Sequence, residues 1–181
     1  MSRILTIENE IANPEQKELL EAIQSQLGGV PNFLRIFANS PTALRAFLGF
    51  YGVANEGSLD LKTRERIALA LAQQNSCEYC VSAHTAFGKK AGLTSDEIAM
   101  NREGSSQDAK AAIAVKLAKS LAEHTGDVTT AELLEARNAG FTDADIVEII
   151  SHVGLNILTN MIGKASQVDI DFPKVALKFD V

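Results

Sequence analysis

The sequence predicts an all-α fold of about eight or nine helices. Apolar residues recur every three or four positions along most of the chain, and capping residues or prolines stand where these segments begin. Alternating β-branched runs bounded by turn residues are nearly absent. With 181 residues, the chain has the length of one domain, so we expect residues 1–181 to form a single helical domain.

Three helices are indicated in the first third of the chain. Pro14 begins PEQKELLEAIQSQL, and Gly28 ends it. Its expected apolar face comprises Leu19, Leu20, Ile23 and Leu27. A short helix is expected over residues 32–38, and Ser40 with Pro41 predicts the start of a third. The expected inward residues of this aromatic region are Phe33, Phe37, Leu44, Phe47, Leu48, Phe50 and Tyr51.

The later helices are indicated mainly by their caps. Asp60 and Ser76 are the expected caps of LKTRERIALALAQQ and CEYCVSAHTAFGKKA, and Gly92 ends the second. Capping-box patterns pair Thr94 with Glu97 and Thr129 with Glu132, and they flank a long Ala-rich helix that ends before Gly126.

The last predicted helix begins after Thr142. The residues expected on its buried side are Ile146, Ile149, Ile150, Val153, Ile157 and Met161. Residues 168–181 have no helical period, so we expect an irregular tail that lies over a neighbouring element or is free.

Composition excludes several classes of protein. A net charge of −6, without clustered Lys and Arg, argues against a nucleic-acid partner. Uninterrupted apolar stretches fall far short of the roughly 20 residues that span a bilayer, so no membrane association is expected. The first residues become acidic before an apolar signal region forms, and we therefore expect a cytoplasmic location.

The chemistry is expected in residues 65–88. On a helix, Cys77 and Cys80 are one turn apart, with Cα atoms roughly 5 Å from each other, a separation that a reversible disulfide accepts. His84 lies one further turn along the same stripe. A nearby base, a helix N-terminus and a second sulfur are the conditions that thiolate chemistry needs.

Glu65 is expected to complete this group from the preceding helix. It shares an apolar stripe with Leu61, Ala68, Leu69 and Ala72, an unusual place for a solvated carboxylate. If the two helices form a hairpin that turns near residues 75–76, Glu65 and His84 are offset by three residues, or roughly 4.5 Å of helix rise. A Glu side chain or one bridging water spans that offset.

Each of these groups also has an ordinary structural interpretation. The cysteines taken alone are typical of small buried apolar residues, and with His84 they form three of the four ligands of a zinc site. The strip of His152, Asn156 and Asn160 on the last helix is typical of a packing interface with satisfied hydrogen bonds. A redox site is favoured instead because four groups occur together at helical spacing, namely Glu65, Cys77, Cys80 and His84.

The pattern E-x11-C-x2-C-x3-H, followed by AGLTSDEI, resembles the AhpD-like alkyl hydroperoxidases of the carboxymuconolactone decarboxylase superfamily. The motif core covers about residues 59–98. The resemblance implies an all-helical subunit, assembled as a trimer or hexamer, that reduces organic hydroperoxides with thiols and uses no haem, flavin or metal. It also implies a dithiol reductant of the dihydrolipoyl or thioredoxin type.

The resemblance assigns a role to each site residue. Cys80 corresponds to the peroxidatic cysteine, Cys77 to the resolving and partner-facing one, His84 to the proton acceptor and Glu65 to the far end of the relay. The helix dipole by itself favours Cys77 as the thiolate, whereas the adjacent base favours Cys80. Tyr79 stands where the best-known members carry a histidine, and its hydroxyl relays protons less readily. The alternatives are a lactone decarboxylase type of enzyme and a non-enzymatic thiol redox sensor.

Overall fold

The computed structural model describes residues 2–178, and within them it contains nine α-helices and no strand. The helices are α1 (Pro14–Leu27), α2 (Asn32–Phe37), α3 (Pro41–Ala54), α4 (Leu61–Gln74), α5 (Glu78–Lys90), α6 (Ser95–Arg102), α7 (Ala109–Glu123), α8 (Thr130–Asn138) and α9 (Asp143–Ser166). The predicted all-α class and helix count are confirmed.

Most helices begin at the residues that the sequence indicates. A side-chain oxygen accepts a backbone N–H of the first turn in seven helices, from Asn13, Ser40, Asp60, Thr94, Asp108, Thr129 and Thr142. The prediction for α5 was wrong, because Cys77 is its cap. Ser76 has a left-handed φ of 53°, which a cap residue in extended conformation does not have.

The second capping difference concerns Glu97. Thr94 caps α6 as expected, but the Glu97 side chain does not return to it. Its oxygens instead accept hydrogen bonds from Arg66, Asn101, Ser106 and the Gln107 backbone. A buried carboxylate with several donors is more stable than one end of a capping box at the surface.

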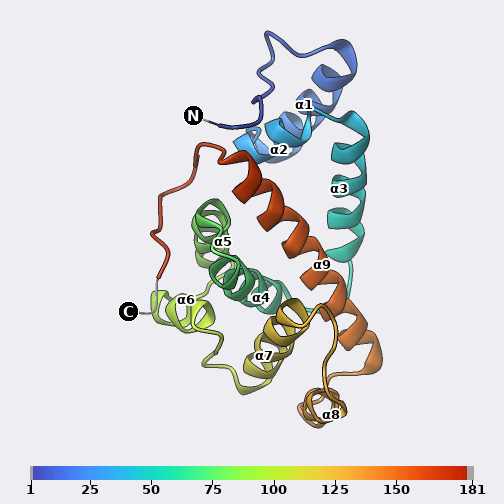
Figure 1. Ribbon diagram of the computed structural model, residues 1–181, viewed down its shortest axis with the longest axis vertical. Helices are drawn as coiled ribbons and strands as arrows, with labels where there is room; N and C mark the ends of the chain where they lie inside the picture. Colours follow the sequence, from blue (N-terminus) through green and yellow to red (C-terminus); the bar gives the residue numbers. More distant parts are fainter. Residues whose placement is uncertain (1, 179–181) are drawn as a thin grey trace.

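Helix α4 lies at the centre of the molecule, and it packs against α5, α6, α7 and α9 (Figure 1). Most of its residues between Thr63 and Ala72 are buried. One apolar cluster joins α4 to α7, α8 and the first half of α9. Another joins α1, α2, α3 and α5 to the C-terminal residues, and it contains Cys77 and Cys80. The cysteine pair is therefore part of the core.

Helix α9 crosses the molecule from α8 to α2 (Figure 1). Although uninterrupted apolar runs are short in this chain, α9 is long and apolar enough to cross a membrane by length and composition, with a mean hydropathy of 1.4. It packs against six of the other helices, and the core helix of a globular protein meets the same criterion.

Several residues predicted to be buried are exposed. Ile150 and Met161 of α9 are 45% and 64% exposed, and the packed side of α9 instead carries His152, Asn156 and Asn160. On α3 only Leu44 and Phe47 are buried, because this helix has neighbours on one side alone. Leu27, at the end of α1, is also exposed.

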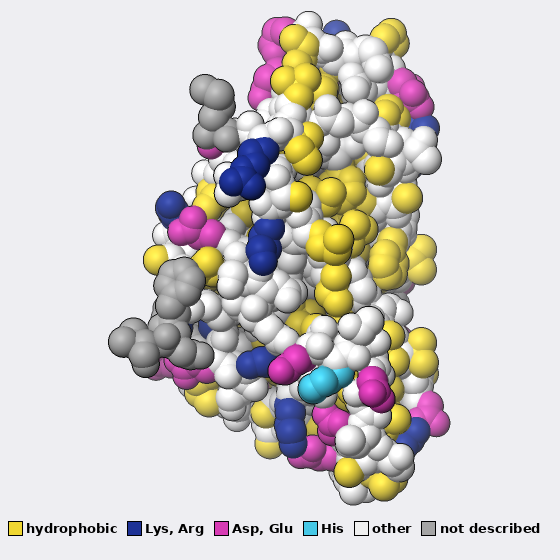
Figure 2. Space-filling model, in the orientation of Figure 1, with side chains coloured by type: hydrophobic (Ala, Val, Ile, Leu, Met, Phe, Trp, Pro, Cys, Tyr) yellow, Lys and Arg dark blue, Asp and Glu magenta, His cyan; other side chains and the backbone are white. Residues whose placement is uncertain are grey.

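Six exposed apolar side chains lie on two neighbouring helices, and we call them together the apolar face. They are Phe50, Tyr51 and Val53 on α3 and Ile150, Leu158 and Met161 on α9. Figure 2 shows apolar side chains gathered over the middle of the molecule, where α3 and α9 lie. No charged residue occurs between Arg45 and Glu56 or between Glu148 and Lys164.

Residues 168–178 form an extended strap without helix or strand, as predicted for this part of the tail; residues 179–181 lie outside the described residues. The strap runs from the end of α9 past α5 to α6 (Figure 1). The backbone N–H of Val175 donates to the buried Ser82 hydroxyl at 3.0 Å, and Arg102 donates to the Ala176 carbonyl at 2.7 Å. The strap thus lies over its own subunit.

Candidate active site

The site is built on the hairpin of α4 and α5. Helix α4 ends at Gln74 with Asn75 as its C-cap, the backbone reverses at Ser76, and the N–H of Cys77 donates to the Ala72 carbonyl at 2.9 Å. Helix α5 then begins at Glu78 and packs along α4. This short reversal aligns residues at equal distances from the turn, as the sequence predicted.

The predicted partnership of Glu65 and His84 is present in this hairpin. The Glu65 Oε2 and His84 Nδ1 atoms are 2.8 Å apart, and the two side chains are 11% and 21% exposed. Because a carboxylate accepts only, the neutral imidazole carries its proton on Nδ1. The lone pair of Nε2 is then free to accept a proton from another group.

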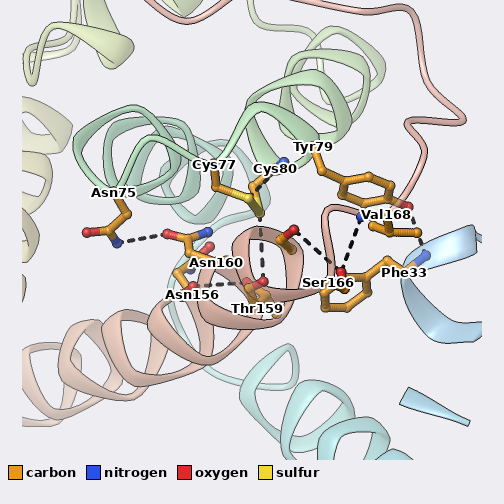
Figure 3. Close-up of a disulfide and its surroundings, with 11 residues drawn as sticks. Phe33, Asn75, Cys77, Tyr79, Cys80, Asn156, Thr159, Asn160, Ser166 and Val168 are labelled. Carbon is orange, nitrogen blue, oxygen red and sulfur yellow. Dashed lines mark hydrogen bonds between the residues drawn. A yellow bond between two sulfur atoms is a disulfide. The ribbon is translucent and has the colours of Figure 1, made fainter. Parts of the chain in front are cut away.

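Cys77 and Cys80 form a disulfide across the first turn of α5, with Cα atoms 5.3 Å apart (Figure 3). The Cys77 Sγ accepts the backbone N–H of Cys80 at 3.3 Å, so this sulfur also caps the helix. The exposed fractions of the two residues are 1% and 4%. Neither cysteine presents its side chain to solvent in the single chain.

The four predicted residues therefore form two pairs on one hairpin. Glu65 is joined to His84 and Cys77 to Cys80. Within residues 2–178, no hydrogen bond joins the imidazole to either sulfur, although His84 lies one turn beyond Cys80 on the same helix. The arrangement places the imidazole of His84 one helical turn from the disulfide along α5.

Tyr79 has a structural role in this form. Its hydroxyl donates to Asp171 Oδ1 at 2.8 Å and accepts the Phe33 N–H at 3.3 Å, and its ring stacks on Phe33. Figure 3 shows this ring directed away from the sulfur atoms. Burial, and then Asp171, raise the pKa of Tyr79, so it stays a neutral phenol. Tyr79 thus fastens the strap to α5.

Helix α9 forms the opposite wall of the disulfide. A Cβ atom added to Gly163 would lie 2.9 Å from the Cys77 Sγ and 3.5 Å from the Cys80 Sγ. The Thr159 carbonyl oxygen is 3.9 Å from the Cys80 Sγ (Figure 3). This wall could not be predicted from the sequence, because a glycine and a backbone carbonyl within a helix form no recognisable motif.

The polar strip of α9 is buried as predicted, but its hydrogen bonds are only partly satisfied. Asn156 donates to the His152 carbonyl, and Asn160 accepts from Asn75 at 2.8 Å. The His152 Nε2 and the Asn160 Nδ2 are buried without a partner among the described residues. Burial, and then Arg64, lower the pKa of His152, which favours the neutral imidazole.

Tyr51 of α3 is a further residue that the sequence analysis assigned only to the core. Its side chain is half exposed on the apolar face. Partial burial, and then the charge of Glu65, raise the pKa of Tyr51. Tyr51 therefore lies within electrostatic range of Glu65.

Known proteins share this arrangement of helices. A model of the carboxymuconolactone decarboxylase family matches residues 41–119, which include the whole site hairpin. The crystal structure of an AhpD-core, peroxidase-related protein from Ralstonia eutropha JMP134 superposes with a TM-score of 0.82 at 25% identity, over 94% of this chain and 92% of that one. The chain belongs to the carboxymuconolactone decarboxylase superfamily. Its predicted AhpD-like resemblance is confirmed.

Other relatives extend the superfamily comparison. A peroxidase-related protein from Silicibacter sp. TM1040 superposes with a TM-score of 0.79 at 26% identity, over 93% of this chain and 94% of that one. An uncharacterized protein of Haemophilus influenzae is 51% identical over 45 residues, 24% of this chain and 40% of that protein. The chain therefore matches less than half of the length of that relative.

The superfamily fold also occurs with a different chemistry. The debrominase Bmp8, solved in complex with 2,3,4-tribromopyrrole, superposes with a TM-score of 0.73 at 15% identity, over 94% of this chain and 92% of that one. At this identity the likeness concerns the fold alone. The superfamily thus supports a peroxidase-related or related enzyme, and the reaction must be argued from the site residues.

Proposed function

We propose that the protein is a thiol-dependent peroxidase that reduces organic hydroperoxides. The observation that carries the proposal is the 2.8 Å contact between Glu65 and His84, one helical turn from a cysteine pair that closes as a disulfide. A base held by a carboxylate next to a cysteine is the arrangement that activates a thiol nucleophile. The peroxidase-related solved relatives support the same reaction class.

In the first half of the reaction, the reduced pair meets the hydroperoxide. The Nε2 atom of His84 accepts the proton of the Cys80 thiol, and Glu65 stabilises the resulting imidazolium. The Cys80 thiolate attacks the outer oxygen of the O–O bond. The bond breaks, the alcohol leaves with the proton from His84, and Cys80 becomes a sulfenic acid.

In the second half, Cys77 resolves the oxidised cysteine. Its thiolate attacks the Cys80 sulfur, hydroxide leaves and takes up a proton to become water, and the disulfide of Figure 3 is formed. An external dithiol of the dihydrolipoyl or thioredoxin type supplies two electrons and two protons to reopen it. This scheme uses no haem, flavin or metal.

The proposal includes assembly of the subunits into a trimer or hexamer in the cytoplasm. The apolar face supports assembly, because a charge-free surface of two adjacent helices is typical of a contact between proteins. Tyr51 on this face lies within electrostatic range of Glu65, which suits a site that a neighbouring subunit helps to enclose.

The test is turnover of cumene hydroperoxide with dithiothreitol as the reductant. We expect Cys80→Ser to abolish turnover and Cys77→Ser to stop after one sulfenic acid per subunit, detected with a sulfenate-specific label. We expect His84→Ala to lose most of the rate, on the order of 10² to 10⁴-fold for a general base. His124→Ala, at the exposed histidine that forms the C-cap of α7, is the matched control. Equal turnover by wild type and Cys80→Ser would eliminate the proposal.

The packing of the disulfide against Gly163 of α9, the helix that carries part of the apolar face, favours a second candidate, a thiol redox sensor. A sensor is oxidised by peroxide once without turnover, and its assembly changes with the state of the disulfide. A sizing column run on the oxidised and reduced protein, beside the turnover assay, separates the two functions.

A further inference from the structure

The side chain of Asn160 is buried and only half used. It is 2% exposed, and its Oδ1 accepts the Asn75 Nδ2 at 2.8 Å. Its own Nδ2 has no partner among the described residues. A buried N–H without an acceptor destabilises the folded state and is uncommon in folded proteins. When Cys77 and Cys80 form a disulfide, the Asn160 amide therefore lacks an acceptor among the described residues.

The contact with Asn75 fixes the direction of this amide. Because Asn75 donates, the oxygen of Asn160 faces it and the nitrogen faces the opposite way. Asn75 precedes Cys77 by two residues, and Figure 3 shows the Asn160 nitrogen on the side of the two cysteines.

The neighbours of Asn160 on α9 contact the sulfur atoms directly. The Thr159 carbonyl lies 3.9 Å from the Cys80 Sγ, and Gly163 allows α9 to approach the Cys77 Sγ. The free donor thus stands in the wall against which the disulfide rests. In the disulfide form, no hydrogen bond from Asn160 reaches either sulfur of the described site.

We propose that Asn160 stabilises the thiolate of Cys77 when the disulfide opens. The Cys77 sulfur already accepts the Cys80 N–H at 3.3 Å. A thiolate is a stronger acceptor than a disulfide sulfur, and it would take the Asn160 amide as its second donor. These two N–H groups would then share the charge of the sulfur.

This inference rests on the proposed redox cycle in one respect, namely that Cys77 becomes a thiolate. That occurs twice. When a donor thiolate attacks the Cys77 sulfur, the Cys80 thiolate leaves and takes up a proton; the second donor thiol then forms its own disulfide and releases the Cys77 thiolate. In the oxidative half, the same thiolate attacks the sulfenic acid of Cys80. Asn160 acts on the charged sulfur in both steps.

The direct test is titration of the Cys77 thiol in a Cys80→Ser background, followed by the ultraviolet absorbance of the thiolate. We expect Asn160→Ala to raise the pKa of this thiol by about one to two units, the value of a hydrogen bond to a charged group. Asn160→Asp keeps the volume and the acceptor for Asn75 but replaces the donor with an acceptor, and we expect a shift at least as large. If Asn160→Ala does not fold, the titration of Asn160→Asp tests the proposal in its place.

The matched control is Asn156→Ala, since the Asn156 amide donates to the His152 carbonyl within α9. In this variant the pKa of the Cys77 thiol should equal that of the protein with Asn156. If both Asn160 variants leave the thiol pKa within a few tenths of a unit of wild type, Asn160 is only a packing residue and the inference is wrong.

A second readout is the equilibrium of the cysteine pair with dithiothreitol. Loss of the thiolate donor makes the reduced form less stable, so Asn160→Ala should lower the equilibrium constant for reduction by about tenfold, or about 30 mV. These measurements do not involve peroxide. A shifted thiol pKa without peroxide turnover would support Asn160 and refute the peroxidase, whereas turnover with an unshifted pKa would do the reverse.

Discussion

Replacement of Gly163 by alanine tests the contact between α9 and the disulfide. Alanine normally stabilises a helix interior by about 0.5–1 kcal/mol relative to glycine. At residue 163, however, the new methyl group would lie 2.9 Å from the Cys77 Sγ, inside the roughly 3.5–4.0 Å at which heavy atoms attract each other. Such overpacking of a core typically costs about 1–3 kcal/mol.

The matched control is Gly154→Ala in the same helix, because a Cβ atom there meets nothing within 4 Å. Gly154→Ala therefore gains the stabilisation that alanine gives a helix, and its new methyl group meets no close neighbour. The difference between the two variants should therefore be about 1–3 kcal/mol of unfolding free energy. For a chain of this size, that corresponds to a melting temperature about 2–12 °C lower for Gly163→Ala.

The assay is thermal and urea unfolding of the oxidised proteins at two concentrations, which reveals any contribution from self-association near Gly154. If Gly163→Ala were as stable as Gly154→Ala, the close approach of α9 to the sulfur atoms would be refuted, and with it the wall that places Asn160.

Three further outcomes are expected. Tyr79→Phe should lower the free energy of unfolding by about 1.5–3 kcal/mol, since Asp171 loses the Tyr79 hydroxyl and keeps only the Asn32 N–H of its two described donors. Trypsin should then cleave the strap faster than in wild type. For Glu97, burial alone would raise the pKa, but hydrogen bonds from Ser106, Asn101, Gln107 and Arg66 hold it at about 2. The stability that comes from this depressed pKa is therefore fully present above pH 4.5 and is lost as the pH falls toward 2. In Glu97→Gln, the midpoint of urea unfolding should accordingly decrease less than in wild type when the pH is lowered from 4.5 toward 2. Met161→Glu on the apolar face should elute as a smaller species from a sizing column than the exposed-site control Lys164→Glu, and identical elution would exclude that face from assembly.

Local signals in the sequence were sufficient for the helices and for the hairpin of the site. Caps such as Asp60 and Thr142 act within one turn, so the residues themselves determine where α4 and α9 begin. The meeting of Glu65 with His84 follows from residue numbers counted back and forward from the turn, because helix rise is constant. Cys77 and Cys80 are separated by one helical turn, so their pairing also follows from the sequence spacing alone.

What the sequence did not predict depends on contacts between distant segments. Ile150 and Met161 fit an apolar stripe, but α4 packs against the strip of His152 and Asn160 instead, and periodicity cannot say which stripe a neighbour covers. The close approach at Gly163 likewise requires the crossing of α9 over α5. The roles of the four site residues stay predictions, since they concern reactions.

The same turns of α9 that touch the sulfur atoms through Gly163 carry Leu158 and Met161 on their outer side. Because a helix is stiff over so short a length, a change of position at the disulfide displaces these outer side chains as well. If a neighbouring molecule covers the apolar face, that contact and the state of the disulfide influence each other through the same turns of α9.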